Sequence, residues 1–120
     1  MQSSERERLV KIIRAMGISN ERLNEAVERV DRADFVPPGL SVRATYQDAP
    51  VSIGEGQTTS QPSLVAQMID ALELAPEDSA LEIGTGFGYQ TALLASICAK
   101  VVSVERHQEL ARQAHTNLAA

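Results

Sequence analysis

A short apolar run that leads into a turn with three glycines at alternate positions is the feature that most restricts how this chain can fold. The run covers residues 80–83, the turn carries Gly84, Gly86 and Gly88, and a second apolar run ends at Glu105. An apolar strand, a glycine-rich turn and an acid about twenty residues further on are the parts of a βαβ nucleotide-binding unit. The segment therefore predicts a parallel sheet with a ligand site at the ends of its strands.

Apolar residues recur at helical spacing on both sides of this unit. Residues 9–16 and 23–30 predict a hairpin of two short helices, with Ser19 or Asn20 capping the second. Pro62 begins a further helix, whose expected apolar stripe comprises Leu64, Val65, Met68, Ile69 and Leu72. Within the unit we expect strands at 80–83 and 101–105 and helices at 89–97 and 108–118.

Residues 34–61 have no such periodicity and are rich in proline, glycine, serine and threonine. Anchors such as Tyr46 and Ile53 would be missing from a disordered linker, so we expect a long, ordered and functional loop. The elements that follow alternate between helix and strand, which predicts right-handed crossovers in a parallel sheet. The expected fold is α/β, with an incomplete parallel sheet preceded by a helical hairpin and this loop.

Composition restricts the class of partner. The 120 residues suffice for one domain, and 11 Lys and Arg against 16 Asp and Glu give a net charge of -5. Such a chain lacks the basic surface that attracts nucleic acids and anionic membranes, so we expect neither as a partner. No apolar stretch in the sequence reaches the length of a membrane span, and a cytoplasmic location is expected.

The spacing of the glycines favours a particular cofactor. It is Gly-x-Gly-x-Gly, shorter than the dinucleotide fingerprint, which frames a pyrophosphate. With Glu82 two residues before the first glycine, the pattern suits S-adenosylmethionine, which has no phosphates. Glu105 would accept hydrogen bonds from the ribose hydroxyls, or else pair with Arg106 at the surface. Glu82 lies in an apolar strand and needs a partner, for which a cofactor ammonium group or a water held by it is suitable.

A second polar segment, residues 54–62, lies directly before the predicted helix at Pro62. It is either a plain loop in which Ser60 or Gln61 caps that helix, or a site whose hydroxyl and amide donors bind a carboxylate. His107 and His115 have no companions at metal-ligand spacing, so we expect surface residues and no metal site.

The sequence resembles the protein-L-isoaspartate O-methyltransferases. The resemblance extends over essentially the whole chain, through Arg32-Ala33-Asp34-Phe35-Val36-Pro37, Tyr46-Gln47-Asp48, residues 53–62, residues 81–90 and Ser103-Val104-Glu105-Arg106. The Gly-Gln-Thr-x-Ser-Gln-Pro string is its specific part. Two departures from the family pattern are Thr59, at a position usually Ile, and Phe87, at a position usually small.

The resemblance implies the roles of individual residues. S-adenosylmethionine would be held by a set of residues in and around the glycine turn: Glu82, Gly84, Thr85, Gly86, Gly88 and Glu105. Thr58 and Ser60 would face the isoaspartyl carboxylate, with Ser60 the usual candidate for a catalytic role. Methyl transfer to a carboxylate needs orientation rather than a strong base, because the nucleophile is already ionised at neutral pH. The product would allow damaged proteins to be repaired.

The resemblance also implies that this chain is the N-terminal portion of a longer enzyme. Residues 1–57 would form a helical, substrate-side segment and residues 58–120 the first half of the Rossmann-like cofactor domain. We expect little or no activity from the chain alone, and self-association through the exposed apolar edge of the strand at 80–83. The alternatives are a methyltransferase for another acceptor and a non-catalytic interaction module with a decayed cofactor site.

Overall fold

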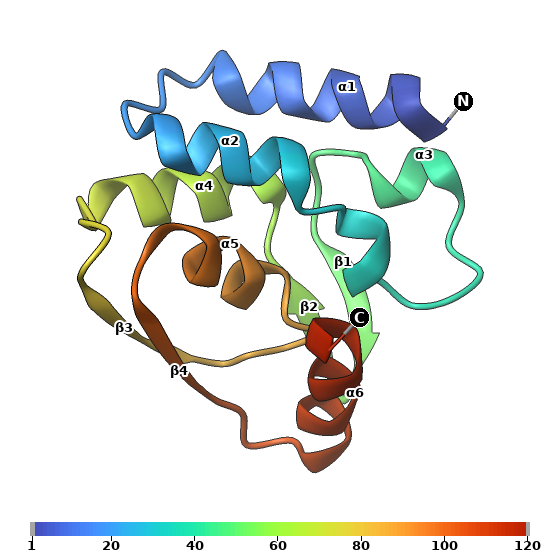
Figure 1. Cartoon of the computed structure of the whole chain (residues 1–120). Coiled ribbons are helices and arrows are strands. Elements are labelled where there is room, and N and C mark those ends of the chain that lie inside the picture. The colour runs from blue at the N-terminus through green and yellow to red at the C-terminus, as the bar shows by residue number, and fades with distance from the viewer. Residues whose placement is uncertain (1, 120) are drawn as a thin grey trace.

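The structure, a computed structural model, describes residues 2–119 (Figure 1). In chain order the elements are α1 (Gln2–Arg14), α2 (Glu21–Arg29), the 3-10 helix η1 (Arg32–Phe35), α3 (Val42–Thr45), β1 (Val51–Gly54), β2 (Gln57–Thr59), α4 (Pro62–Ala71), β3 (Ser79–Ile83), α5 (Tyr89–Ile97), β4 (Lys100–Val104) and α6 (Gln108–Ala119). The predicted α/β class and the order of the main elements are confirmed. None of the helices among residues 2–119 has the length and apolarity that crossing a bilayer requires.

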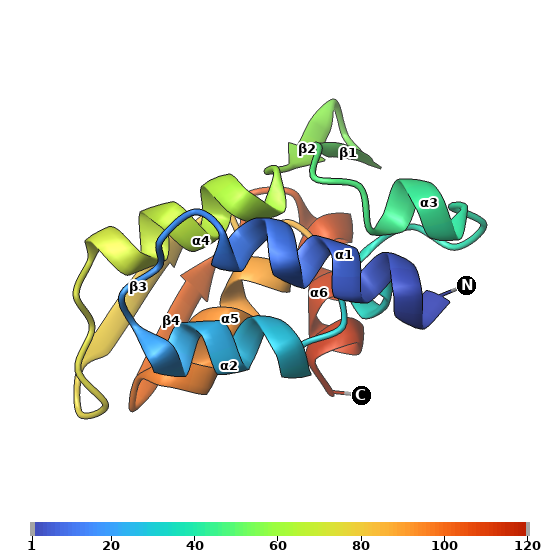
Figure 2. The ribbon, with the colours of Figure 1, turned by 90° about the horizontal axis from the view of Figure 1, so that it is seen from above.

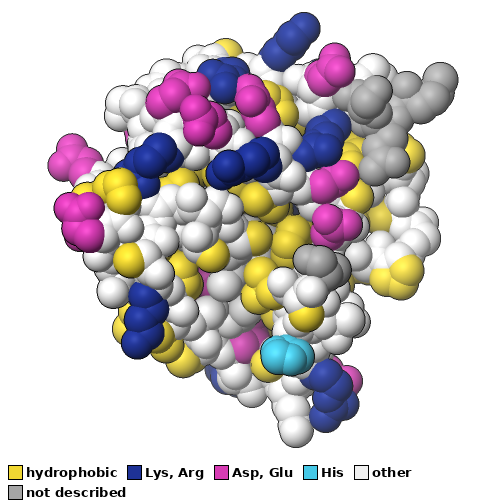
Figure 3. Space-filling model, viewed as in Figure 1, with side chains coloured by type: hydrophobic (Ala, Val, Ile, Leu, Met, Phe, Trp, Pro, Cys, Tyr) yellow, Lys and Arg dark blue, Asp and Glu magenta, His cyan; other side chains and the backbone are white. Residues whose placement is uncertain are grey.

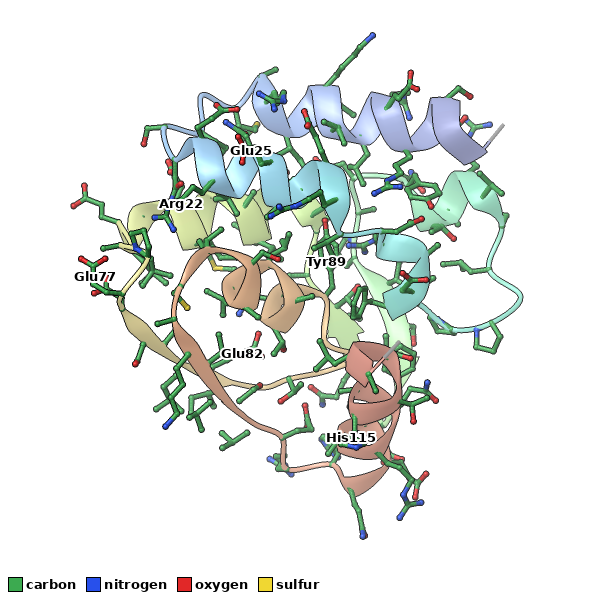
Figure 4. The ribbon with its side chains drawn as sticks, in the orientation of Figure 1. Arg22, Glu25, Glu77, Glu82, Tyr89 and His115 are labelled. Carbon is green, nitrogen blue, oxygen red and sulfur yellow. The ribbon has the colours of Figure 1, made fainter. Side chains whose placement is uncertain are left out.

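The first two helices form the predicted hairpin, which lies across the top of Figure 1 with α5 packed beneath α2. Asn20 caps α2, since its side chain accepts a hydrogen bond of 3.2 Å from the backbone N–H of Leu23. Arg22 of the same helix donates to the carbonyl groups of Ile97 and Leu74 (Figure 4). It thereby ties the hairpin to the C-terminal end of α5.

Strands β3 and β4 form the expected parallel pair, with α5 as the crossover. Their register runs from Ser79 opposite Lys100 to Ile83 opposite Val104. The two faces of this pair differ sharply. Glu82 is buried toward α5, while Leu81 and Ile83 are 67% and 75% exposed on the other face. The sequence predicted an exposed apolar edge, but the structure also leaves a whole sheet face uncovered.

The segment expected to be an aperiodic loop, residues 34–61, contains short elements. The end of η1, the single-turn helix α3 and an antiparallel hairpin of β1 and β2 all lie within it. The hairpin turns at Glu55 and Gly56, whose φ angles of 55° and 68° are the left-handed values that a two-residue turn of this kind needs. Such short elements complete no period, which is why the sequence pattern missed them.

Helix α4 departs from the predicted stripe. Val65 and Ile69 are buried, but Leu64, Met68 and Leu72 are 46%, 45% and 59% exposed, so the prediction was wrong for these three. The predicted stripe is broader than the face of α4 that α1 and α2 cover, so part of it remains exposed. In Figure 2 α4 lies beside α1, with which it is in contact.

Candidate binding and catalytic site

The glycine turn, residues 84–88, connects the end of β3 to the start of α5. Gly84, Gly86 and Gly88 have φ angles of 94°, 58° and 102°, all in the region that favours glycine. The N–H of Gly84 donates to the carbonyl of Val104 at 2.8 Å, which continues the β3–β4 ladder into the turn. The backbone is thus fixed at the carboxyl end of the sheet.

The three glycines do not offer equal space to a ligand. A Cβ atom at Gly84 would meet no heavy atom within 4 Å, whereas one at Gly86 would lie 3.2 Å from Ile53 and one at Gly88 would lie 3.2 Å from Leu118. Asn117 also donates to the carbonyl of Phe87 at 3.0 Å. The end of α6 therefore packs on the turn at Gly88, and the open side of the turn is at Gly84.

Phe87, the bulky residue of the glycine turn, is largely buried. Its side chain is 9% exposed and belongs to the main hydrophobic cluster. The larger residue in the glycine turn is accommodated in the core.

Glu105, directly after β4, accepts hydrogen bonds from two backbone N–H groups. Gly86 donates to Oε1 at 2.9 Å, and His107 donates to Oε2 at 3.0 Å. Burial favours the neutral carboxyl group, but the N–H groups of His107 and Gly86, with smaller effects of the His107 charge and the Arg106 N–H, lower the pKa of Glu105 below its ordinary value. Each oxygen has a further lone pair, so the carboxylate can still accept the two hydroxyls of a ribose.

Glu82 is 3% exposed, and its acceptors are used by side chains of this chain. Thr91 and Ser103 donate to Oε1, and Gln90 donates to Oε2 at 2.9 Å. The sequence led us to expect a cofactor ammonium group or a water in this role. The contacts instead show Glu82 fixing β4 and the first turn of α5 around β3, which leaves Oε2 the oxygen with capacity for another donor.

The polar segment before α4, residues 57–61, forms a hydroxyl loop. Its side chains alternate, as in an extended strand. Thr58 and Ser60 are exposed, while Thr59 and Gln61 are half-buried and hydrogen-bonded. Thr59 Oγ1 accepts from Arg32 at 3.1 Å, and Gln61 donates to Asp48 at 3.1 Å. The two residues expected to face a ligand are thus those left open.

The cap of α4 comes from a distant residue. Asp48 accepts a hydrogen bond of 2.9 Å from the backbone N–H of Ser63, in the first turn of the helix. Gln61 occupies the N-cap position without making a side-chain cap bond. The simple alternative for this loop, in which Ser60 or Gln61 caps α4, was therefore right about the N-cap position of Gln61 but wrong about the side chain that makes the cap bond. The carboxylate of Asp48 caps α4, and this cap does not involve the Ser60 side chain.

Two adjoining pockets join these parts. The loop pocket, of about 80 Å³, is lined by Thr58, Thr59, Ser60, Val65 and residues 84–90. The strand-end pocket, of about 400 Å³, is lined by Gln57, Ile83, Gly84, Val104, Glu105, Arg106 and His107. Gly84 lines both, so a ligand lying over the turn from Glu105 would reach the hydroxyls of the loop.

The structure therefore brings together most of the residues that the sequence singled out. Thr58, Ser60, Gly84, Gly86 and Gly88 line the loop pocket with Thr85, whose hydroxyl lies 2.5 Å from that of Ser103. Glu105 lines the strand-end pocket. Glu82 lines neither and lies behind the turn.

Sequence reasoning gave no role to Arg32 or Asp48, which hold the loop from behind. Both lie in segments that carry the family resemblance, and this is a signal that could have identified them.

The two histidines differ in their surroundings. Within residues 2–119 no group of three or more His, Cys, Asp and Glu side chains is placed to hold a metal ion. His115 is exposed on α6 (Figure 4), and Nδ1 of the half-buried His107 lies 4.0 Å from Glu55 in the β1–β2 turn. His107 is thereby a bridge between the hairpin and the strand-end pocket.

Solved structures share this arrangement. One protein-L-isoaspartate O-methyltransferase superposes on 95% of this chain and 38% of its own length, with a TM-score of 0.83 and 28% sequence identity. A second structure, from Plasmodium falciparum and in complex with S-adenosyl-L-homocysteine, covers 92% of this chain and 53% of its own, with a TM-score of 0.77 and 25% identity.

Sequence relatives agree. The protein-L-isoaspartate O-methyltransferase of Methanoculleus marisnigri is 53% identical over 116 residues, 96% of this chain and 52% of the relative. An enzyme of the same name, numbered 2, from Marinobacter nauticus is 54% identical over 102 residues, 85% of this chain and 46% of the relative. The chain spans about half the length of the curated relatives it matches. The family model for protein-L-isoaspartate(D-aspartate) O-methyltransferase matches residues 4–120, so the chain belongs to this family.

Proposed function

We propose that the chain supplies the N-terminal portion of an S-adenosylmethionine-dependent methyltransferase that acts on the carboxylate of L-isoaspartyl residues in damaged proteins. The glycine turn and Glu105 hold the cofactor, and Thr58 and Ser60 orient the acceptor carboxylate. Isoaspartyl-containing peptides and proteins are the substrates. The cytoplasm is the proposed location, and neither nucleic acid nor membrane is a proposed partner.

One observation carries this proposal: the hydroxyl loop and the glycine turn line the same pocket. A cofactor whose ribose is bound at Glu105 and whose remaining part crosses the turn at Gly84 would bring its methyl group to this pocket. Transfer from a sulfonium to a carboxylate is a displacement in which both partners have only to be aligned. The exposed hydroxyls of Thr58 and Ser60 are hydrogen-bond donors suited to orienting a carboxylate, and no general base is required.

A cofactor-binding measurement distinguishes the proposed enzyme from a non-catalytic module with a decayed cofactor site. It uses a fusion protein, called the joined chain, in which residues 1–120 are followed by the part of the Methanoculleus marisnigri relative that this chain does not match. Calorimetry should show S-adenosyl-L-homocysteine binding to the joined chain and much weaker binding to residues 1–120 alone, which lack part of the pocket. The same joined chain with Gly84→Val is the control, since a side chain there enters the open side of the turn. Absence of binding to the folded joined chain would leave only a non-catalytic module.

We propose the division into residues 1–57 and 58–120 as one of function rather than of folding. β1 pairs with β2 across this boundary, and a single hydrophobic cluster draws on Leu9 and Leu23 as well as Leu93. The first part supplies the substrate side and the supports of the hydroxyl loop. The second supplies residues 58–61 of the loop and the cofactor residues.

We propose that residues 1–120 alone self-associate through β3 and its uncovered face. Leu81, Ile83, Val102 and Val104 lie exposed there, and hydrophobic side chains reach the surface where β3 and β4 lie (Figure 3). Among the described residues β3 pairs only with β4, so its other edge is open to a second copy related by a two-fold axis.

Sedimentation velocity at micromolar concentration tests this association. We expect a dimer that Ile83→Lys dissociates, while Met16→Lys, which changes an exposed apolar residue just after α1, leaves it intact. A stable monomer of the unaltered chain would contradict the proposal.

A further inference from the structure

Arg32, the first residue of η1, is a buried cation without a paired anion. Its side chain is 2% exposed. Nη2 donates to the carbonyl of Ala49 at 3.2 Å and to Thr59 Oγ1 at 3.1 Å, but Nε and Nη1 have no hydrogen-bond partner within the described residues. Burial is the main effect on this group and lowers the pKa of Arg32. Keeping an unpaired charge in the interior is costly, so its position requires an explanation.

The guanidinium group lies directly behind the loop pocket. Thr59, which accepts its hydrogen bond, lines that pocket. So does Tyr89, whose ring centroid is 5.4 Å from Cζ of Arg32. Two neighbours of Arg32 thus form part of the pocket wall, and Ser60 lines the same pocket.

The nearest acids do not neutralise the charge by direct contact. Asp48 is hydrogen-bonded to Gln61 and Ser63, and within residues 2–119 no carboxylate oxygen lies within 4.0 Å of the Arg32 guanidinium. The acceptor of the proposed reaction is itself a carboxylate. A carboxylate bound in the loop pocket would face a positive charge that is itself buried, and solvent screens such a charge less than one at the surface.

We propose that Arg32 is the counter-charge of the acceptor pocket: it favours an ionised carboxylate over a neutral group in front of Ser60, while its bond to Thr59 holds the hydroxyl loop in place. This inference rests on the proposed function of the loop pocket. Arg32 acts through the pocket wall and is a positioning residue, because it touches neither the acceptor nor the cofactor. Thr59, the residue that departs from the usual Ile, gives the guanidinium an acceptor.

A thiol introduced in place of the Ser60 hydroxyl measures this potential without a ligand. The pKa of a thiol falls where a positive charge favours its thiolate. The only native cysteine, Cys98, is first changed by Cys98→Ala, and the Ser60→Cys variant is then titrated by its rate of alkylation against pH. Ser79→Cys is the matched control, since Ser79 is exposed at the opposite end of β3. The charge is removed with Arg32→Met or Arg32→Gln and retained with Arg32→Lys.

The expected result is a lower pKa for the thiol at position 60 than for the control thiol at position 79. Loss of the charge should lower the thiolate-to-thiol ratio at position 60 at neutral pH by about threefold or more, with partial rescue by Arg32→Lys and no change at position 79. Thermal unfolding identifies the neutral variants that remain folded. A thiol pKa at position 60 equal to or above that at position 79 overturns the proposal even if no Arg32 variant folds. An unchanged thiol pKa at position 60 in a folded neutral variant overturns it as well.

The proposed function can fail separately. A thiol pKa at position 60 that depends on Arg32, in a joined chain that binds no S-adenosyl-L-homocysteine, would refute the enzyme and retain the charged pocket. A joined chain that methylates isoaspartyl peptides, but whose Ser60→Cys variant has an ordinary thiol pKa, would support the enzyme and refute the role of Arg32 as counter-charge.

Discussion

Glu82 and Glu105 lie near the carboxyl ends of neighbouring strands, but their surroundings are different. Glu82 is enclosed and accepts three hydrogen bonds from side chains, while Glu105 accepts two from the backbone at the rim of the strand-end pocket. A buried carboxylate that satisfies its neighbours is costly to remove, because those neighbours lose their acceptors. Glu82 therefore supports the fold, and Glu105 is available to a ligand.

Removing the Glu82 carboxylate should destabilise the protein strongly. Glu82→Ala leaves the donors of Gln90, Thr91 and Ser103 without their acceptor, and we expect a loss of about 2–4 kcal/mol in the free energy of unfolding. Glu82→Gln keeps the shape and one acceptor oxygen and should cost less. Urea unfolding of both variants checks the order, and a smaller loss for Glu82→Ala would show that the network does not stabilise the fold.

Glu105 should give the protein a pH-dependent stability. Its pKa in the folded protein lies below the ordinary 4.5, so its contribution is fully present above that value and is lost as the pH falls through the folded-state pKa. Glu105→Gln removes this pH-dependent contribution to the free energy of unfolding. The difference in unfolding free energy between the original chain and Glu105→Gln should narrow between roughly pH 6 and pH 3. A difference that stays constant or widens on acidification would refute the assignment.

At the scale of elements, the glycine turn and α6 depend on each other. Gly84→Ala introduces only backbone strain at a φ of 94°, which should cost about 1–2 kcal/mol. Gly88→Ala has a similar φ but also places a Cβ atom 3.2 Å from Leu118, so it should cost about 1 kcal/mol more, because the exposed Leu118 side chain can partly move aside. Thermal unfolding compares the two, and Leu118→Ala should relieve part of the second cost. Equal losses at the two glycines would mean that α6 does not pack on the turn.

The sequence predicted those elements whose residues form a period. The strands at 80–83 and 101–105 and the helices around them were found within one or two residues, because the apolar pattern and the glycines act locally. The β1–β2 hairpin was missed, since three- and four-residue strands complete no pattern. The partners of Glu82, the cap provided by Asp48 and the burial of Arg32 depend on contacts between distant segments, which no local pattern contains. The exposure of Leu64 and Met68 likewise depends on which elements cover α4.

At the scale of the whole molecule, apolar residues are buried on one side of the sheet and exposed on the other. The helical hairpin, α5 and α6 enclose the hydrophobic cluster, whereas α4 and the outer face of β3 and β4 expose large apolar residues: Leu64, Met68, Leu72, Leu81, Ile83, Val102 and Val104. Exposed apolar residues gathered on one sheet face are typical of a surface that contacts another part of a protein or a partner. Its position beside the two pockets explains why we expect residues 1–120 alone to show little turnover.

The most direct test is methyl transfer by the joined chain from labelled S-adenosylmethionine to a peptide that contains one L-isoaspartyl residue. We expect transfer to this peptide, none to the matched peptide with ordinary aspartate, and a loss of at least about tenfold in kcat/KM with Ser60→Ala, about 1.4 kcal/mol of transition-state stabilisation. Gln67→Ala, at an exposed position of α4 outside both pockets, should leave the rate unchanged. A folded joined chain that binds S-adenosyl-L-homocysteine but methylates neither peptide, or both equally, would contradict the account.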